Sequence, residues 1–386
     1  MNLVKGSAQQ ELDHFFKVLH DEKHARQIVT KSALVQARKK LSATAFVELN
    51  KQVVDRYYAQ AHYNTWKGFR LCAVDGSTLR VPNTPAIIKT FGVHRGRLAQ
   101  KGCPMALASV YYDVLNQVVI DARLAPIHSA ERELADEHLA HAAPNDLVLF
   151  DRGYPSFWLY ASLQQRQQAF CMRVKFKANR LYQQFLHSRK AQTTVEIMPT
   201  AHSQQKCTEK GLPITPIRLR LVRVKLKKET EILITNLLDE ERYPACVFKE
   251  LYHLRWGIEE NYKRQKQWLE IESFSGKSAL SVFQDFHAKM LTMNITAIMV
   301  AESQKQVNHT MSARTHRYKI NFAQALSKMK DTVIELIRNL TRHTRILQVL
   351  QYLSNTVDAV IPNRSFPRHI TNTHPNIKNL CYKRCR

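Results

Sequence analysis

The stretch Phe69–Ser77 reads FRLCAVDGS, a short apolar run that stops at a carboxylate. A short apolar run of this kind is typical of a β-strand. A second such run, Asp146–Phe150, ends directly before Asp151 in the stretch FDRGY. Acids that follow neighbouring strands meet at one edge of a sheet, so Asp75 and Asp151 are predicted to lie close together. Taken singly each acid is more often structural, since Asp-Gly also forms hairpin turns.

The residues on either side predict a mixed sheet with helical cover. Between the two acids, strands are expected at 105–112 and 117–124 and a helix at 129–142. A second helix is expected just after Asp151, at 155–168. Strands return over 169–240, at 170–176, 193–198, 217–227 and 230–237. Both ends show helical spacing, over residues 1–70 and from about 246 to 353. The predicted fold class is therefore α/β with helical terminal regions.

The charge of the chain points to a polyanionic partner. Its 386 residues carry a formal net charge of +26, and the excess is uneven. Residues 71–160 and 250–300 are close to neutral, whereas the remaining stretches, 1–70, 161–249 and 301–386, carry +6, +10 and +11. We interpret this pattern as a near-neutral core with basic modules that bind a polyanion. The alternative is that the charges are distributed along the chain by chance. Nucleic acid is favoured over a membrane, because no apolar stretch approaches the roughly 18 residues of a spanning helix.

The seven cysteines are scattered and include no CxxC pair. Such a pattern indicates neither a zinc site nor a disulfide framework, and it predicts reduced thiols in a cytoplasmic protein. The strongest concentration of charge in a predicted strand lies at 217–227, where cations change parity at Leu221-Val222. We expect a β-bulge or a change of exposed face there, and either phosphate contacts or a charged edge strand. The cations concerned are Arg218, Arg220, Arg223, Lys225 and Lys227.

A third acid, Glu259, lies in a predicted helix with a polar front. At about 100° per residue, Tyr252, Arg255 and Lys266 share one stripe with Glu259, and the apolar residues occupy the opposed face. The simple alternative is a set of intrahelical ion pairs worth a few tenths of a kcal/mol each. On spacing alone, the helix is a candidate to bring a carboxylate and two cations to one place.

Together these motifs resemble the DDE transposases of bacterial insertion sequences, in the type-four group. The resemblance is carried by Asp75-Gly76-Ser77, by Asp151-Arg152-Gly153-Tyr154, and by the Tyr-x2-Arg-x3-Glu-x6-Lys spacing of residues 252–266. It covers about residues 70–290. It implies an RNase H-like catalytic core, formed by 71–160 and 250–300 and interrupted by a basic β-rich insertion, 161–249. The resemblance does not reach the terminal regions, 1–70 and 301–386. Their pattern and charge predict that both are helical and basic and that the first binds DNA.

The resemblance also implies the roles of the candidate residues. Asp75, Asp151 and Glu259 would be the catalytic triad and hold two Mg²⁺ or Mn²⁺ ions, a role that suits hard oxygen ligands. Tyr252, Arg255 and Lys266 would contact phosphates of the transposon ends, and Arg152 would touch DNA or brace Asp151. The expected activity is metal-dependent DNA cleavage and strand transfer on double-stranded transposon ends and target DNA. A homodimer in a synaptic complex, associated with the bacterial nucleoid, is expected by the same analogy.

Three other functions fit parts of the sequence. The chain could be a catalytically inactive or domesticated DNA-binding protein derived from a transposase. It could be a general RNase H-like nuclease that does not join strands. A recombinase with Tyr252 as nucleophile fits less well, because no cluster of Arg and His surrounds that tyrosine.

Overall fold

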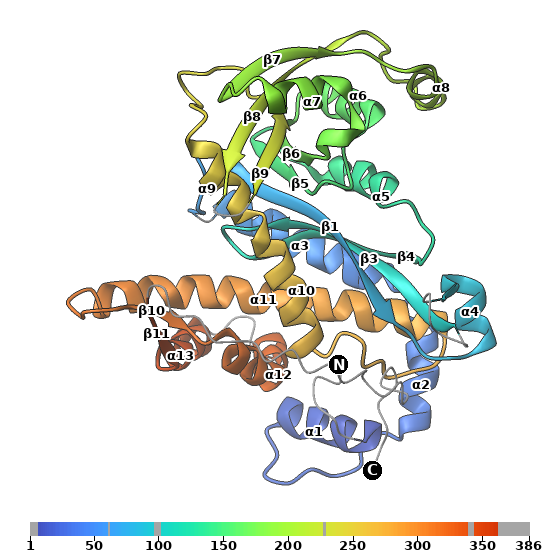
Figure 1. Ribbon diagram of the computed structural model, residues 1–386. Coiled ribbons are helices and arrows are strands. Elements are labelled where there is room, and N and C mark those ends of the chain that lie inside the picture. Colours follow the sequence, from blue (N-terminus) through green and yellow to red (C-terminus); the bar gives the residue numbers. More distant parts are fainter. Residues whose placement is uncertain (1–6, 61, 96–101, 227–228, 339–342, 362–386) are drawn as a thin grey trace. The chain divides into compact units, whose positions relative to one another are not determined.

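Strands fill the middle of the chain in the computed structural model, which describes residues 7–60, 62–95, 102–226, 229–338 and 343–361 (Figure 1). Their bounds are β1 Arg70–Arg80, β2 Val93–His94, β3 Cys103–Asp113, β4 Val118–Pro126, β5 Asp146–Phe150, β6 Ala169–Val174, β7 Gln192–Ile197, β8 Ile217–Lys225 and β9 Thr230–Thr235. Within the described residues these form one sheet of nine strands in the order β2-β3-β1-β5-β6-β9-β8-β7, with β4 paired to β3. The mixed sheet expected from the sequence is confirmed.

The centre of the sheet is parallel and fully buried. β1 pairs with β5 from Arg70↔Asp146 to Val74↔Phe150, and β5 pairs in parallel with β6. The apolar residues of both β1 and β5 in this register are 0% exposed, which explains why neither run alternates with polar residues. The register is fixed at one end by a buried ion pair, in which the Arg70 guanidinium donates to both Asp146 oxygens at 2.6 and 2.7 Å.

The basic stretch expected to form an insertion domain extends the same sheet. β9 pairs antiparallel with β6, β8 with β9, and β7 with β8. The pairing of β8 with both neighbours is continuous, so the expected alternative of a β-bulge is wrong and the change of exposed face is correct. Two helices between these strands, α7 (Arg180–His187) and α8 (Ala201–Glu209), were not anticipated from the sequence.

Four helices accompany this part of the sheet, and all were expected, although not with these bounds. They are α5 Glu131–His138, α6 Phe157–Gln165, α9 Val247–Leu254 and α10 Trp256–Gln267. In α6 the run Phe157–Leu163 is buried on every side, because the helix packs against α5, α8 and β6. α5 begins with two acids in its first turn, where the helix dipole favours negative charge.

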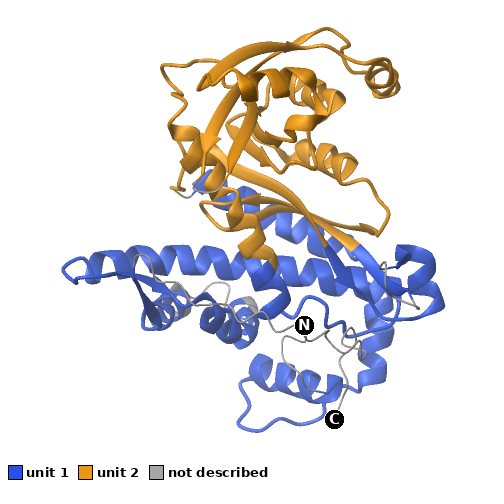
Figure 2. Cartoon of the chain, viewed as in Figure 1, with its two compact units in different colours: residues 1–61, 78–106, 263–386 blue, residues 62–77, 107–262 orange. Residues whose placement is uncertain are grey.

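The chain divides into two units, coloured in Figure 2. One consists of residues 62–77 and 107–262, and it contains most of the sheet. The other consists of residues 1–61, 78–106 and 263–386. These units cut across the five stretches distinguished by charge, because the division falls inside β1, β3 and α10, which contribute residues to both.

The second of these units is mainly helical, as its sequence pattern predicted. Its elements are α1 Ala8–His20, α2 Lys31–Lys39, α3 Thr44–Gln60, α4 Pro85–Phe91, α11 Ala279–Thr310, α12 Phe322–Arg338, α13 His343–Ser354 and the antiparallel strands β10 Arg317–Ile320 and β11 Val357–Val360. The long helix α11 packs against α3, α12 and α13 (Figure 1). Within this unit, Arg38 forms an ion pair with Asp285 of α11 at 2.8 Å.

Candidate functional site

The two aspartates follow paired residues of adjacent parallel strands, at the point where the pairing of β1 with β5 stops. β5 ends at Phe150 as the sequence predicted, but β1 continues past Asp75 to Arg80, so the predicted end of that strand at Asp75 is wrong. The paired residues Val74 and Phe150 directly precede Asp75 and Asp151, so the carboxylates follow matched positions in neighbouring strands. The parallel register explains this arrangement, since it sets matched residues of β1 and β5 side by side. Each acid acts electrostatically on a shared neighbour, the guanidinium of Arg255. The predicted convergence of these two residues is confirmed.

Asp75 is held in a half-buried position. Its Oδ1 accepts the Gly76 N–H at 2.9 Å, and its backbone carbonyl accepts the Tyr262 hydroxyl at 2.8 Å. Burial raises the pKa of Asp75 to about 6, although the Gly76 N–H and Arg255 oppose the rise; Asp151 and Glu131 add to it. The site therefore makes ionisation of this carboxylate harder than it is in water, and a nearby cation would compensate its charge.

The helix expected to carry Glu259 is interrupted. α9 ends at Leu254 and α10 begins at Trp256, with Arg255 between them. At this point the hydrogen bonds tighten to the i→i−3 pattern, from Arg255 N–H to Tyr252 O and from Ile258 N–H to Arg255 O. The prediction that one continuous helix carries Tyr252, Arg255, Glu259 and Lys266 is therefore wrong in detail. The tighter turn at Arg255 separates this segment into two helices.

Arg255 links the acids of the site. Its Nη2 donates to Glu259 Oε1 at 2.7 Å, and its Nη1 lies 3.9 Å from Asp75 Oδ2. The residue is only 5% exposed and packs over the Tyr252 ring, while its Nε has no hydrogen-bond partner among the described residues. Burial works against this charge, but Tyr252, Glu259 and Asp151 raise the pKa of Arg255 above its usual value. One guanidinium thus brings Asp75 and Glu259 to the same place.

The carboxylates do not form a closed metal centre by themselves. Over the part of the chain that the structure describes, no three acids, histidines or cysteines are gathered closely enough to hold a metal ion. The position of Arg255 gives the physical reason, since its cation lies between Asp75 and Glu259. In donor chemistry the three carboxylates still suit a hard divalent cation.

The remaining members of the Tyr-Arg-Glu-Lys motif have internal partners. Tyr252 is 4% exposed, and its hydroxyl donates to the carbonyl of Phe150 at 3.2 Å, one residue before Asp151. Lys266 is exposed, and its Nζ donates to the carbonyl of Thr78 at 3.0 Å within the other unit. Tyr252 therefore stabilises the strand end that carries Asp151.

The cations of β8 fall into two classes. Arg218 and Lys225 are exposed. Arg220 is 0% exposed; its guanidinium donates to the carbonyls of Leu237 and Tyr243. The prediction that Arg220 contacts DNA is corrected by this burial, because its charge serves to join β8 to the segment before α9.

Arg223 has a role of its own on the same strand. Its guanidinium donates to the carbonyls of Phe185, Leu186 and Lys190, at and beyond the last turn of α7. A cation is favoured there because the last carbonyls of a helix lack partners. Arg223 is partly exposed, so it combines this capping role with some accessibility.

Sequence reasoning missed two residues beside Asp75. Tyr154, in the quoted motif but given no role, is 1% exposed, and its hydroxyl has no hydrogen-bond partner among the described residues. Burial raises its pKa well above the usual value, and Asp75, Glu131 and Asp151 raise it further. Glu131, an acid in the first turn of α5, is the second of these residues. Arg152 is exposed.

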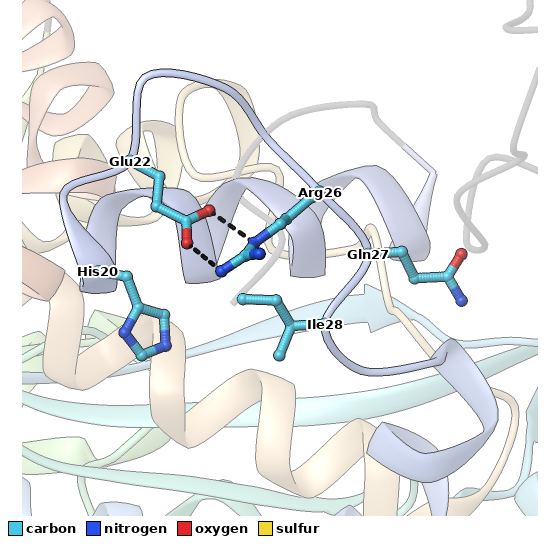
Figure 3. Close-up of a pocket in the computed structure, with 5 residues that line it drawn as sticks. All are labelled: His20, Glu22, Arg26, Gln27 and Ile28. Carbon is cyan, nitrogen blue, oxygen red and sulfur yellow. Dashed lines mark hydrogen bonds and ion pairs between the residues drawn. The ribbon is translucent and has the colours of Figure 1, made fainter.

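A pocket elsewhere holds none of the predicted residues. It lies in the loop after α1, where His20, Gln27 and Ile28 line it together with an ion pair of Glu22 and Arg26 at 2.6 Å (Figure 3). The Arg26 side chain is 72% exposed, so this pair is a surface contact of little energetic weight.

Comparisons with known proteins place this site in a family. A family model described as "Transposase DDE domain" matches residues 66–295. The chain belongs to this family. The match includes all three acids, and membership implies a general dependence on divalent metal ions. The family named from the sequence motifs is thereby confirmed.

Individual relatives agree with the family. The chain is 25% identical over 247 residues to the transposase InsG for insertion sequence element IS4 of Escherichia coli K12, covering 64% of this chain and 55% of that protein. It is 26% identical over 148 residues to InsZ of the same organism, covering 38% and 50%. The chain thus spans about half the length of the curated relatives it matches.

A solved structure of a piggyBac transposase synaptic complex with hairpin DNA aligns with 77% of this chain and 59% of that one, at a TM-score of 0.41 and 10% identity.

Two further expectations concern membrane-spanning helices and the cysteines. Among the described residues, no helix is long and apolar enough to cross a membrane. The described cysteines are free thiols, at positions 72, 103, 171, 207 and 246; Cys381 and Cys385 lie outside the described residues.

Proposed function

We propose that this chain is a DNA transposase that binds the ends of an insertion sequence, cleaves them and joins them to target DNA. The observation that carries the proposal is the meeting of Asp75 and Glu259 on one guanidinium, with Asp151 at the matched end of the next strand. Membership of the DDE transposase domain family supports the same chemistry. Three acids so distant in sequence have no structural need to share one cation.

We infer that Asp75, Asp151 and Glu259 hold two Mg²⁺ or Mn²⁺ ions. Such ions, when bound, activate the attacking oxygen and stabilise the leaving oxygen of a phosphodiester. The chain itself positions the acids. The β1–β5 pairing sets Asp75 against Asp151, the hydroxyl of Tyr252 fixes the carbonyl before Asp151, and Arg255 orients Glu259.

The DNA contacts follow from which cations are accessible. Arg152, Arg218, Lys225 and Lys266 are exposed and suit phosphate contacts. Arg255 is buried, and its planar guanidinium can grip a phosphate bidentately once it is released from its carboxylates. The partner is double-stranded DNA, both transposon ends and target, bound by a homodimer in a synaptic complex in the bacterial cytoplasm.

The proposal is tested with a labelled duplex that carries the inverted repeats flanking the coding region. Wild-type protein with Mg²⁺ or Mn²⁺ is expected to release a 3′-OH at the repeat end and to join it to a second duplex. Asp75→Ala, Asp151→Ala and Glu259→Ala are each expected to abolish both products while retaining binding of the duplex in a gel-shift assay. Glu241→Gln is the matched control, because Glu241 is exposed and has no ion pair to the described residues.

The outcomes separate the alternatives. Cleavage by all three alanine variants would refute the assignment of the triad. Cleavage of unrelated duplexes without joining would identify a general nuclease. Specific binding without cleavage by the wild type would identify an inactive DNA-binding descendant of a transposase.

A further inference from the structure

Glu131, the first residue of α5, stands apart from the other acids of its helix. Glu133 pairs with Lys210 at 2.5 Å, and Glu137 pairs with Arg123 at 2.5 Å. Glu131 is exposed and makes no hydrogen bond or ion pair with the described residues. An acid in the first turn already gains from the helix dipole, but that gain does not determine where its side chain lies.

The Glu131 side chain lies against the backbone next to Asp75. A Cβ added at Gly76 would be 3.1 Å from Glu131 Oε1 and 3.2 Å from its Cδ. The N–H of the same glycine donates to Asp75 Oδ1 at 2.9 Å. Gly76 is therefore flanked by two carboxylates, and the absence of a side chain at this position leaves room for Glu131 to approach.

A buried hydroxyl gives independent evidence that this corner takes a ligand. Tyr154 is 1% exposed, and its Oη has no hydrogen-bond partner among the described residues. The acids that act on it are Asp75, Glu131 and Asp151, and Arg255 opposes them, which places the phenol among the charged groups of this corner. A buried hydroxyl without a partner costs about 1–3 kcal/mol, so its retention here indicates a polar group that it meets in the working protein.

Charge balance gives the acid a role. Arg255 is paired with Glu259 and lies close to Asp75, so the three predicted ligands and this guanidinium sum to −2. Two divalent ions bring +4. A fourth carboxylate raises the negative charge facing them to −3 and leaves a single positive charge for the scissile phosphate.

We propose that Glu131 is a fourth carboxylate of the metal-binding set, acting beside Asp75. The proposal rests on the proposed function, since it assumes that Asp75, Asp151 and Glu259 hold divalent ions. Glu131 increases the affinity of the site for these ions, and Tyr154 contributes its hydroxyl to the same corner.

The test measures Mn²⁺ binding without DNA, by following the electron paramagnetic resonance signal of free Mn²⁺ during titration. Glu131→Gln is expected to weaken binding about tenfold or more, the range found when groups around a metal site are removed. Asp75→Ala is expected to abolish binding at that site. Glu241→Gln should bind like the wild type. The Mn²⁺ concentration that gives half-maximal cleavage should rise for Glu131→Gln by the same factor, with activity regained at high Mn²⁺.

A second variant tests the geometry. Gly76 lies outside the positive-φ region, so alanine is compatible with its backbone, and the added Cβ pushes against Glu131. Gly76→Ala should weaken Mn²⁺ binding in the wild type and have no further effect in a Glu131→Ala background. An equal loss in both backgrounds would mean that alanine acts through Asp75, and it would overturn the role of Glu131.

The possible failures are distinguishable. If Asp75→Ala loses Mn²⁺ but Glu131→Gln binds like Glu241→Gln, the fourth carboxylate is refuted and the proposed function stands. If Asp75→Ala binds Mn²⁺ like the wild type, the metal site of the proposed function fails and Glu131 fails with it.

Discussion

Asp75→Asn is expected to stabilise the metal-free protein while removing its activity. The pKa of Asp75 is about 6 in the folded chain, against an ordinary value of 3.8, and the side chain is 22% exposed. Between these values the folded state holds a proton that the unfolded state has released. The contribution of this group to stability therefore falls as pH rises from about 4 to about 7.

The size of the effect follows from the two pKa values. Each unit of difference corresponds to about 1.4 kcal/mol, so the carboxylate destabilises the fold by about 3 kcal/mol at pH 7.5 and by about 1.5 kcal/mol at pH 5. Asparagine keeps an oxygen that can accept the Gly76 N–H but carries no charge. The variant should therefore exceed the wild type by these amounts.

The assay is urea unfolding in EDTA at both pH values, with Glu241→Gln as the control that changes an exposed acid. Adding Mn²⁺ should raise the stability of the wild type and leave Asp75→Asn unchanged, because only a folded site with its carboxylate gains from the ion. A variant that is no more stable than the wild type at pH 7.5 would refute the reasoning, and so would a gain that does not grow between pH 5 and pH 7.5.

The remaining predictions concern the arginines of the sheet and the charge of the whole chain. Arg220→Met should lower the free energy of unfolding by about 2–4 kcal/mol, because buried carbonyls lose a charged donor. Arg218→Gln should leave the free energy of unfolding unchanged and weaken binding of duplex DNA. The reverse pattern would contradict the structural role of Arg220 and the DNA-binding role of Arg218. Arg70→Met leaves Asp146 buried without its counter-charge and should cost about 3–5 kcal/mol in urea unfolding, so a cost below about 1 kcal/mol would show that this pair does not fix the register. Affinity for duplex DNA should fall steeply as salt rises, and a flat response in filter binding would contradict the charge argument.

The sequence was sufficient where local pattern determines position. The runs before Asp75 and Asp151 are apolar because both faces of β1 and β5 are covered, and the parallel pairing then brings the acids together. The Glu259 helix was also predictable from its spacing. The spacing did not reveal the tightened turn at Arg255. A single turn with i→i−3 hydrogen bonds leaves the spacing of polar residues in the sequence unchanged.

Other features depend on contacts between distant segments. The alternation in β8 shows which residues share a face, but it does not show that Arg220 is covered by the segment before α9. Strand composition likewise gave no sign that β7–β9 continue the central sheet, since pairing between segments far apart in sequence leaves no local trace. Glu131 was visible as a first-turn acid, and only the position of Gly76 beside it indicates a functional role.

The position of Arg255 constrains the order in which the site can be used. One guanidinium cannot remain paired with Glu259, approach Asp75 and also grip a DNA phosphate with both of its donor pairs. Under the proposed function, ions bound by the carboxylates would compete with Arg255 for the same oxygens and would free its guanidinium. In the metal-free protein Arg255 keeps Asp75 and Glu259 together and compensates part of their repulsion; with ions bound, the same residue would become available to a phosphate of the substrate.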